Sequence, residues 1–233
     1  MSEAGSAVPA NLALVRRRLA AACAAAGRAA DAVELLAVSK THPAEQVRAA
    51  WTAGQRAFGE NRVQELAAKA AGLGDLPGLR WHLIGSLQTN KVRELVALPG
   101  LELVHSLDRA RLADELQREL SRAGRRLDVL LQIHATDEPT KHGCVPAEAP
   151  ALLAHVVDHC PAVAVVGLMA MGPLVGDPLP VFRRVVTLRD ELRQRSGLAL
   201  PVLSMGMSSD LEAAVAAGST LVRIGTAVFG ARG

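Results

Sequence analysis

Short, nearly continuous apolar runs alternate with longer amphipathic segments along this chain. Runs such as Leu35-Leu36-Ala37-Val38 show no strict alternation of polar and apolar positions, which is typical of parallel strands buried on both faces. This pattern predicts eight strands, over residues 34–40, 56–61, 81–85, 103–108, 129–134, 165–171, 202–207 and 221–225.

The segments between these runs repeat apolar residues every three or four positions, as helices with one buried face do. The first helix is expected over residues 11–26, with Asn11 as its N-cap and Gly27 just after its end. Further helices are expected over residues 43–53, 61–71, 89–97, 109–123, 147–159, 180–195 and 209–217.

The repeated strand–helix unit indicates an α/β fold, a single closed (β/α)8 TIM-type barrel with an extra N-terminal helix. We expect one domain over residues 1–233, with residues 1–10 flexible. A doubly wound open sheet is the alternative, but no Gly-x-Gly-x-x-Gly motif follows the first predicted strand.

Composition narrows the functional class. Half of the 233 residues are hydrophobic, which is enough for a large buried core. The net charge of +3 comes without a basic run interleaved with aromatic residues, so a nucleic-acid partner is not expected. The apolar runs are too short for a membrane span, and the N-terminus lacks a signal-peptide pattern. Three cysteines without metal-ligand spacing suit a reducing compartment, and we expect a cytoplasmic protein.

Polar residues stand at the carboxyl ends of the predicted strands, where barrels of this kind place their sites. Lys40, at the end of the first strand, is one of only four lysines among 26 basic residues. A primary amine can form a Schiff base with a carbonyl compound, and a guanidinium cannot. The alternative is an ordinary ion pair between Lys40 and a carboxylate such as Glu60.

The ends of the last two strands predict a phosphate site, because barrels often bind phosphate there with a helix N-terminus. Ser209 and Glu212 match a capping box, while Gly225 and Thr226 offer close backbone approach and a hydroxyl. An ordinary helix cap and a structural glycine are the alternative. Arg223 precedes this turn and is expected to contact either a ligand or a carboxylate, with Asp108 and Glu60 as candidates.

Other polar residues are less informative. His82 and His105 lie on neighbouring predicted strands without HxH or HExxH spacing, so they are interpreted as structural and no metal site is expected. Lys141 follows the fifth strand and is either a surface charge or a second amine near the site.

Several motifs occur together from near residue 34 to the end of the chain. They include Leu36-Ala37-Val38-Ser39-Lys40-Thr41, Phe58-Gly59-Glu60-Asn61, His82-Leu83-Ile84-Gly85, Leu203-Ser204-Met205-Gly206-Met207-Ser208 and Val222-Arg223-Ile224-Gly225-Thr226. With this set the chain resembles the pyridoxal 5′-phosphate (PLP) homeostasis protein family, which is similar to the N-terminal domain of alanine racemase.

The resemblance implies a fold-type III PLP barrel. It places the following residues at the cofactor: Lys40, Asn61, His82, Ser204, Ser208, Arg223, Gly225 and Thr226. Lys40 would hold PLP as a Schiff base, Arg223 would contact the pyridine nitrogen, and Ser208, Gly225 and Thr226 would bind the phosphate. The sequence departs from the family pattern at His134, where Asn is usual, and at Ser86, where Pro is common.

The same resemblance favours a carrier over an enzyme. Arginine keeps its proton, so Arg223 would leave the pyridine nitrogen unprotonated and the cofactor a weak electron sink, which suits either a racemase or a non-catalytic carrier. The related racemases use a Lys and a Tyr as bases, the Tyr from an additional β-domain, whereas this chain has no Tyr and ends at Gly233. We therefore expect a monomeric, non-enzymatic protein that buffers PLP and delivers it to apo-enzymes.

Two alternatives stay open at this point. One is a small PLP-dependent racemase or lyase that uses His82, His105 or Cys144 as its second base. The other is a Schiff-base aldolase that acts on a sugar phosphate.

Overall fold

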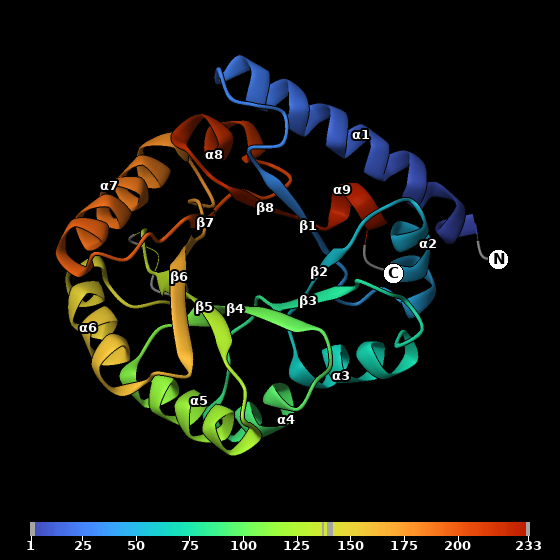
Figure 1. Cartoon of the computed structure of the whole chain (residues 1–233). Helices are drawn as coiled ribbons and strands as arrows, with labels where there is room; N and C mark the ends of the chain where they lie inside the picture. Colours follow the sequence, from blue (N-terminus) through green and yellow to red (C-terminus); the bar gives the residue numbers. More distant parts are fainter. Residues whose placement is uncertain (1–2, 137, 139–141, 232–233) are drawn as a thin grey trace.

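The structure is a computed structural model that describes residues 3–136, 138 and 142–231, with side chains from residue 7 onward. Eight parallel strands close into a barrel in the order β1 to β8, and helices surround it (Figure 1). The strands are β1 (Glu34–Val38), β2 (Ala57–Glu60), β3 (Arg80–Leu83), β4 (Leu101–Leu107), β5 (Leu127–Ile133), β6 (Val163–Ala170), β7 (Val202–Ser204) and β8 (Leu221–Ile224). The predicted closed barrel is confirmed, and each strand lies within a few residues of its expected place.

The helices follow the strands on the outside of the barrel. They are α1 (Glu3–Ala25), α2 (Ala44–Thr52), α3 (Val63–Gly72), α4 (Val92–Val96), α5 (Ala110–Ala123), α6 (Ala149–His159), α7 (Leu179–Ser196), α8 (Leu211–Ala217) and α9 (Thr226–Phe229), with 3-10 turns η1 (Thr89–Lys91) and η2 (Pro146–Glu148). Helix α1 precedes the barrel and packs outside it against α2, α8 and α9 (Figure 1). None of the helices in the described ranges has the length and apolar character that a bilayer crossing requires.

Each strand presents alternate residues to the helices and to the inside of the barrel. In β8, Val222 and Ile224 belong to the large apolar core between strands and helices. Leu221 faces the opposite way from these two residues and packs inside the barrel with Leu36 of β1. Arg223 has the same inward facing as Leu221 and is buried. The barrel interior therefore combines small apolar clusters with buried polar groups.

Helix α1 and its contacts differ from expectation. The helix begins at Glu3 rather than near residue 11, and Val8 within it is fully buried. Asn11 is therefore inside the helix and is not its N-cap; its side-chain amide donates to the carbonyl of Val228 at 3.1 Å. Burial of Val8 explains the longer helix, because packing of an apolar face outweighs the cost of Pro9 inside the helix.

Candidate functional site

The cavity beside Lys40 lies where β1 and β8 end. Its volume is about 280 Å³, which is near the lower end of small-molecule sites at roughly 300–1,000 Å³. The lining residues are Val38, Lys40, Ile84, Met207, Ser208, Ser209, Arg223, Gly225 and Thr226. The parallel strands bring all of them to one rim, so five predicted cofactor residues share this cavity: Lys40, Ser208, Arg223, Gly225 and Thr226.

A buried ionic cluster holds the turn that carries Lys40. The ammonium group of Lys69 on α3 donates to the carbonyl of Ser39 at 2.7 Å, to Glu60 Oε1 at 2.7 Å and to Glu65 Oε1 at 2.8 Å. These three bonds use all three donors of a lysine. Ser39 Oγ also donates to Glu60 Oε1 at 2.6 Å, so the residue before Lys40 is fixed through both its backbone and its side chain.

The residue after Lys40 is fixed as well. Thr41 has a φ of +67°, in the left-handed region that costs a non-glycine residue about 1 kcal/mol or more. Its backbone N–H donates to Glu65 Oε1 at 2.5 Å, which holds this conformation. The backbone of Lys40 therefore lies between two anchored neighbours, and the direction of its side chain is constrained from both sides.

The cluster changes the interpretation of Glu60. The sequence offered Glu60 as an ion-pair partner for Lys40, but the structure places its Oε1 against Lys69 and Ser39. Burial raises the pKa of Glu60, while the bonds from Lys69 and Ser39 oppose that rise. Its second oxygen, Oε2, is buried and has no hydrogen-bond partner in the part of the chain that the structure describes.

Arg223 is the buried cation of the cavity. Its Nη1 donates to the carbonyl and the hydroxyl of Ser204, at 2.6 and 2.7 Å, and its Nη2 donates to the carbonyl of Ala170 at 3.0 Å. Neither carboxylate suggested from the sequence is its partner, because Asp108 pairs with Arg109 and Glu60 with Lys69. Burial lowers the pKa of Arg223 to about 10, which still leaves it charged at neutral pH.

The turns after β7 and β8 supply the hydroxyl groups of the cavity: Ser208, Ser209 and Thr226. Gly225 lies so close to β1 that a Cβ there would stand 3.2 Å from the Val38 carbonyl oxygen. The predicted capping box is wrong. Helix α8 begins after Asp210, whose carboxylate accepts from the Met207 N–H at 2.6 Å, and Glu212 instead pairs with Arg18 of α1 at 2.5 Å.

A second, larger cavity lies at the same end of the barrel. Its volume is about 560 Å³, and its lining includes Asn61, Ser86, Lys91 and Arg109. Asn61 therefore lines this neighbouring cavity and not the one around Lys40. The second cavity is larger, but we place the candidate site in the smaller cavity beside Lys40. The smaller cavity combines a lysine, a buried arginine and hydroxyl groups.

The other predicted cofactor residues, His82 and Ser204, are buried inside the barrel and line neither cavity. Ser204 contacts Arg223 directly, while His82 bonds to His105 and Glu102. Of the two departures from the family pattern, Ser86 lines the larger cavity and His134 Nε2 bonds the carbonyl of Glu138 at 2.9 Å. Lys141 lies outside the described residues.

One group on the outer surface places three potential metal ligands, Asp114, His155 and Cys160, within 4.8 Å of one another. His155 Nε2 lies 2.7 Å from Asp114 Oδ1, closer than the roughly 3.3 Å between two ligands of one tetrahedral zinc ion. Burial raises the pKa of the Cys160 thiol and Asp114 adds to the rise, which disfavours the thiolate that a metal needs. We interpret the group as an ion pair beside a buried thiol, and the expected absence of a metal stays a prediction.

Known proteins are similar in sequence to this chain over nearly its whole length. The model of the alanine racemase N-terminal domain matches residues 11–233. The pyridoxal phosphate homeostasis protein of Aquifex aeolicus is 44% identical over 225 residues, which cover 95% of this chain and 97% of the relative. The chain belongs to the pyridoxal phosphate homeostasis protein family.

Solved structures agree with this family. PipY of Synechococcus elongatus, solved with PLP bound, is 41% identical with a TM-score of 0.84, and the match covers 96% of this chain and 100% of PipY. Alanine racemase of Corynebacterium glutamicum is 18% identical with a TM-score of 0.70, over 97% of this chain and 61% of the racemase. The second likeness concerns the fold alone, so the homeostasis protein family shares its barrel with enzymes.

Proposed function

We propose that this chain binds PLP as a Schiff base on Lys40, and that it buffers the cofactor and delivers it to apo-enzymes without turning over a substrate. The observation that carries the proposal is the cavity of about 280 Å³ in which Lys40, Arg223, Ser208 and Thr226 meet. The PLP bound to PipY and the names of the relatives support the same ligand.

The donors of this cavity fit the polar parts of PLP. The uncharged amine of Lys40 can add to the aldehyde carbon with loss of one water. Hydroxyl groups of Ser208 and Thr226 can donate to the phosphate, and Gly225 allows close approach of the chain. Arg223 uses three of the five N–H donors of a guanidinium within the described residues, which leaves two for a ligand.

The environment of Arg223 suits a weak electron sink, which fits a carrier or a racemase, and the placement of the candidate second bases favours the carrier. PLP, when bound, supplies an electron sink for carbanions, and that sink is strongest when the pyridine nitrogen is protonated. With a pKa of about 10, Arg223 stays protonated and can only donate to that nitrogen. The candidate second bases are poorly placed, since both ring nitrogens of His82 and of His105 are already hydrogen-bonded.

The test is reductive trapping of the purified protein with PLP. Borohydride treatment, digestion and mass spectrometry should locate one reduced PLP adduct, on the peptide that contains Lys40. The same preparation should not racemise or cleave L- or D-amino acids above a protein-free PLP control. Turnover would favour the racemase or lyase alternative, and trapping of a sugar phosphate without PLP would favour the aldolase.

Cys144 offers a separate check on the lyase alternative. Burial raises the pKa of its thiol to about 12, with Asp108 adding to the rise. A shift from 9.0 to about 12 leaves roughly a thousandfold less thiolate at neutral pH. Iodoacetamide should therefore alkylate Cys144 far more slowly in the native protein than in urea, as measured by mass spectrometry of its peptide. Rapid native alkylation would contradict the buried, protonated thiol and restore Cys144 as a candidate base.

A further inference from the structure

A chain of hydrogen bonds runs through the barrel interior from Arg223 to the opposite end. The Arg223 guanidinium donates to Ser204 Oγ, which lies 3.0 Å from His105 Nδ1. His105 Nε2 lies 3.0 Å from His82 Nδ1, and His82 Nε2 lies 2.8 Å from Glu102 Oε2. Ser204, His105 and His82 are almost completely buried, so the protein itself must satisfy their polar groups.

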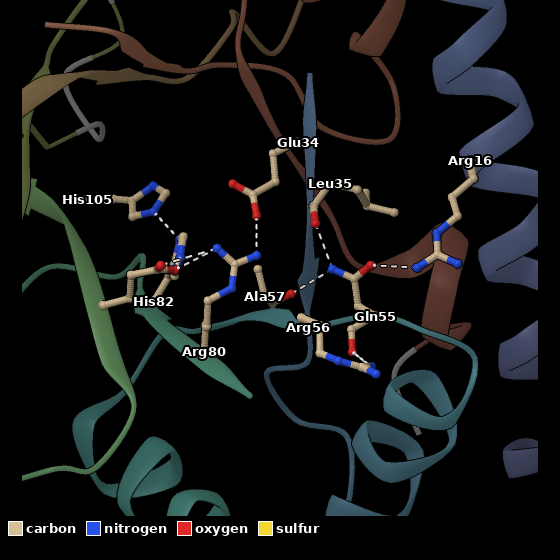
Figure 2. Close-up of polar contacts among 10 residues, drawn as sticks. Arg16, Glu34, Leu35, Gln55, Arg56, Ala57, Arg80, His82 and His105 are labelled. Atoms are coloured by element: carbon tan, nitrogen blue, oxygen red, sulfur yellow. Dashed lines mark hydrogen bonds and ion pairs between the residues drawn. The ribbon is translucent and has the colours of Figure 1, made fainter. Parts of the chain in front are cut away.

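The far end of this series of hydrogen bonds lies where the strands begin. Glu102 is the second residue of β4, and Arg80, the first residue of β3, contacts both Glu102 and Glu34 of β1. Figure 2 shows His105 and His82 leading from the barrel interior toward Arg80, which lies between them and Glu34. The series of hydrogen bonds therefore connects the candidate site with the amino end of the barrel.

Charge and protonation determine which group donates and which accepts in each of these hydrogen bonds. The hydrogen bond from His82 lowers the pKa of Glu102, so Glu102 is a carboxylate that only accepts, and His82 Nε2 must carry a proton. Arg223 Nη1 donates to Ser204 Oγ, so the Ser204 hydroxyl donates its own proton to His105 Nδ1, 3.0 Å away. Burial, with the charge of Arg223 adding to it, holds the pKa of His105 well below its usual value. The uncharged His105 ring then carries its proton on Nε2 and donates to His82 Nδ1.

Every link thus donates away from Arg223 and toward Glu102. Aligned hydrogen bonds polarise one another, so the chain increases the negative charge on Ser204 Oγ, where Arg223 donates. Direct attraction between the two ends contributes little, because about 40% of the Glu102 side chain is exposed and water screens it. The influence of Glu102 on Arg223 therefore acts through the orientation of bonds.

We propose that Glu102 sets the orientation of the hydrogen bonds that reach Arg223, and that His82, His105 and Ser204 are the positioning residues of a relay that transmits this orientation to the cofactor cavity. The inference rests on the proposed function, since Arg223 matters there as the donor to PLP. It assigns a role to His82 and Ser204 that does not require contact with the cofactor. Other charges near the relay are Arg80 and Glu34 at its base, Asp128 beside Glu102, and Asp210 near Arg223.

The matched variants are Glu102→Gln and Glu34→Gln. Both carboxylates accept from Arg80 and their side chains are similarly exposed, 40% and 41%, but only Glu102 contacts His82. In the protein without PLP, long-range ¹H–¹⁵N spectra of the imidazole rings should show His82 and His105 with the proton on Nε2. Glu102→Gln should produce a mixture of tautomers, because an amide can donate as well as accept, and Glu34→Gln should not.

The second readout is the pH midpoint of the visible band of the PLP-loaded protein. We expect Glu102→Gln to shift this midpoint by about 0.5 pH unit or more, Glu34→Gln to leave it unchanged, and Glu102→Gln to have no effect once Ser204→Ala has broken the relay. Equal shifts in both single variants, or no shift in Glu102→Gln, would overturn the inference. Absence of any band in the wild type would instead refute the proposed function, and a wild-type ring protonated on Nδ1 in the unloaded protein would refute the relay.

Discussion

Lys40→Ala is expected to abolish the yellow absorption band that forms when the purified protein is mixed with PLP. Among the residues that line the Lys40 cavity, Lys40 alone carries a primary amine. Alanine removes the amine and leaves the hydroxyl groups of Ser208 and Thr226 to bind the phosphate. PLP should then dissociate on gel filtration, with a Kd raised by about a hundredfold, or ~2.7 kcal/mol.

Lys91→Ala is the matched control for this experiment. Lys91 lines the larger cavity at the same end of the barrel, pairs with Glu94 at 3.1 Å and is about one-third exposed. It should keep both the band and the affinity. A band that survives in Lys40→Ala would move the attachment to another lysine, with Lys141 tested first, and a wild type without a band would favour the sugar-phosphate aldolase.

The fold could be predicted because its signal is local. Runs such as Leu35-Leu36-Ala37-Val38 are buried on both faces in the structure as in the prediction, and each is followed by a helix. Helix ends were less predictable. Asn11 and Ser209 look like caps by residue type, but tertiary contacts decide both places, since Asn11 donates to Val228 and Asp210 closes the turn before α8.

The site was partly predictable for the same reason. Lys40 and Thr226 follow strands whose ends meet at one rim, so a correct order of strands already brings them together. Sequence spacing alone could not place Lys69, because its role depends on how far α3 is rotated toward the turn after β1. One signal was available: Lys69 falls on the buried face of α3 with Val63 and Leu66.

The relay from Glu102 to Arg223 depends on features that no short motif records. It requires inward facing at His82, His105, Ser204 and Arg223 on four different strands, and the register of those strands sets each distance. Residue type and spacing predict only structural histidines and separate cofactor ligands at these positions, because they record neither facing nor register. Their arrangement makes the interior of this barrel a polar connection between its two ends.

Lys69→Met should cause the largest loss of stability of any single change near the site. Methionine leaves Glu60, which is fully buried, without its cation, and it removes one of the two hydrogen bonds to the Ser39 carbonyl and one of the two to Glu65 Oε1. Removing one partner of a buried ion pair costs about 3–5 kcal/mol. Urea unfolding at about pH 8 should show this cost in the free energy of unfolding. Lys91→Met, which removes a partly exposed pair with Glu94, should change the free energy of unfolding by less than about 1 kcal/mol.

The pH dependence of that loss identifies its cause. Burial already raises the pKa of Glu60 in the folded wild type, and loss of the opposing bond from Lys69 should raise it further. A carboxyl group with a raised folded-state pKa binds its proton more tightly when folded, so its destabilising effect is complete above that pKa and shrinks as the pH falls through it. The cost of Lys69→Met should therefore be smaller at about pH 5 than at about pH 8. Glu60→Gln added to Lys69→Met should recover part of the stability at about pH 8, because the uncompensated charge is then gone. A cost that is independent of pH and unaffected by Glu60→Gln would mean that Lys69 acts through packing alone. The interpretation that the buried ionic cluster around Lys69 holds the Lys40 turn would then be wrong.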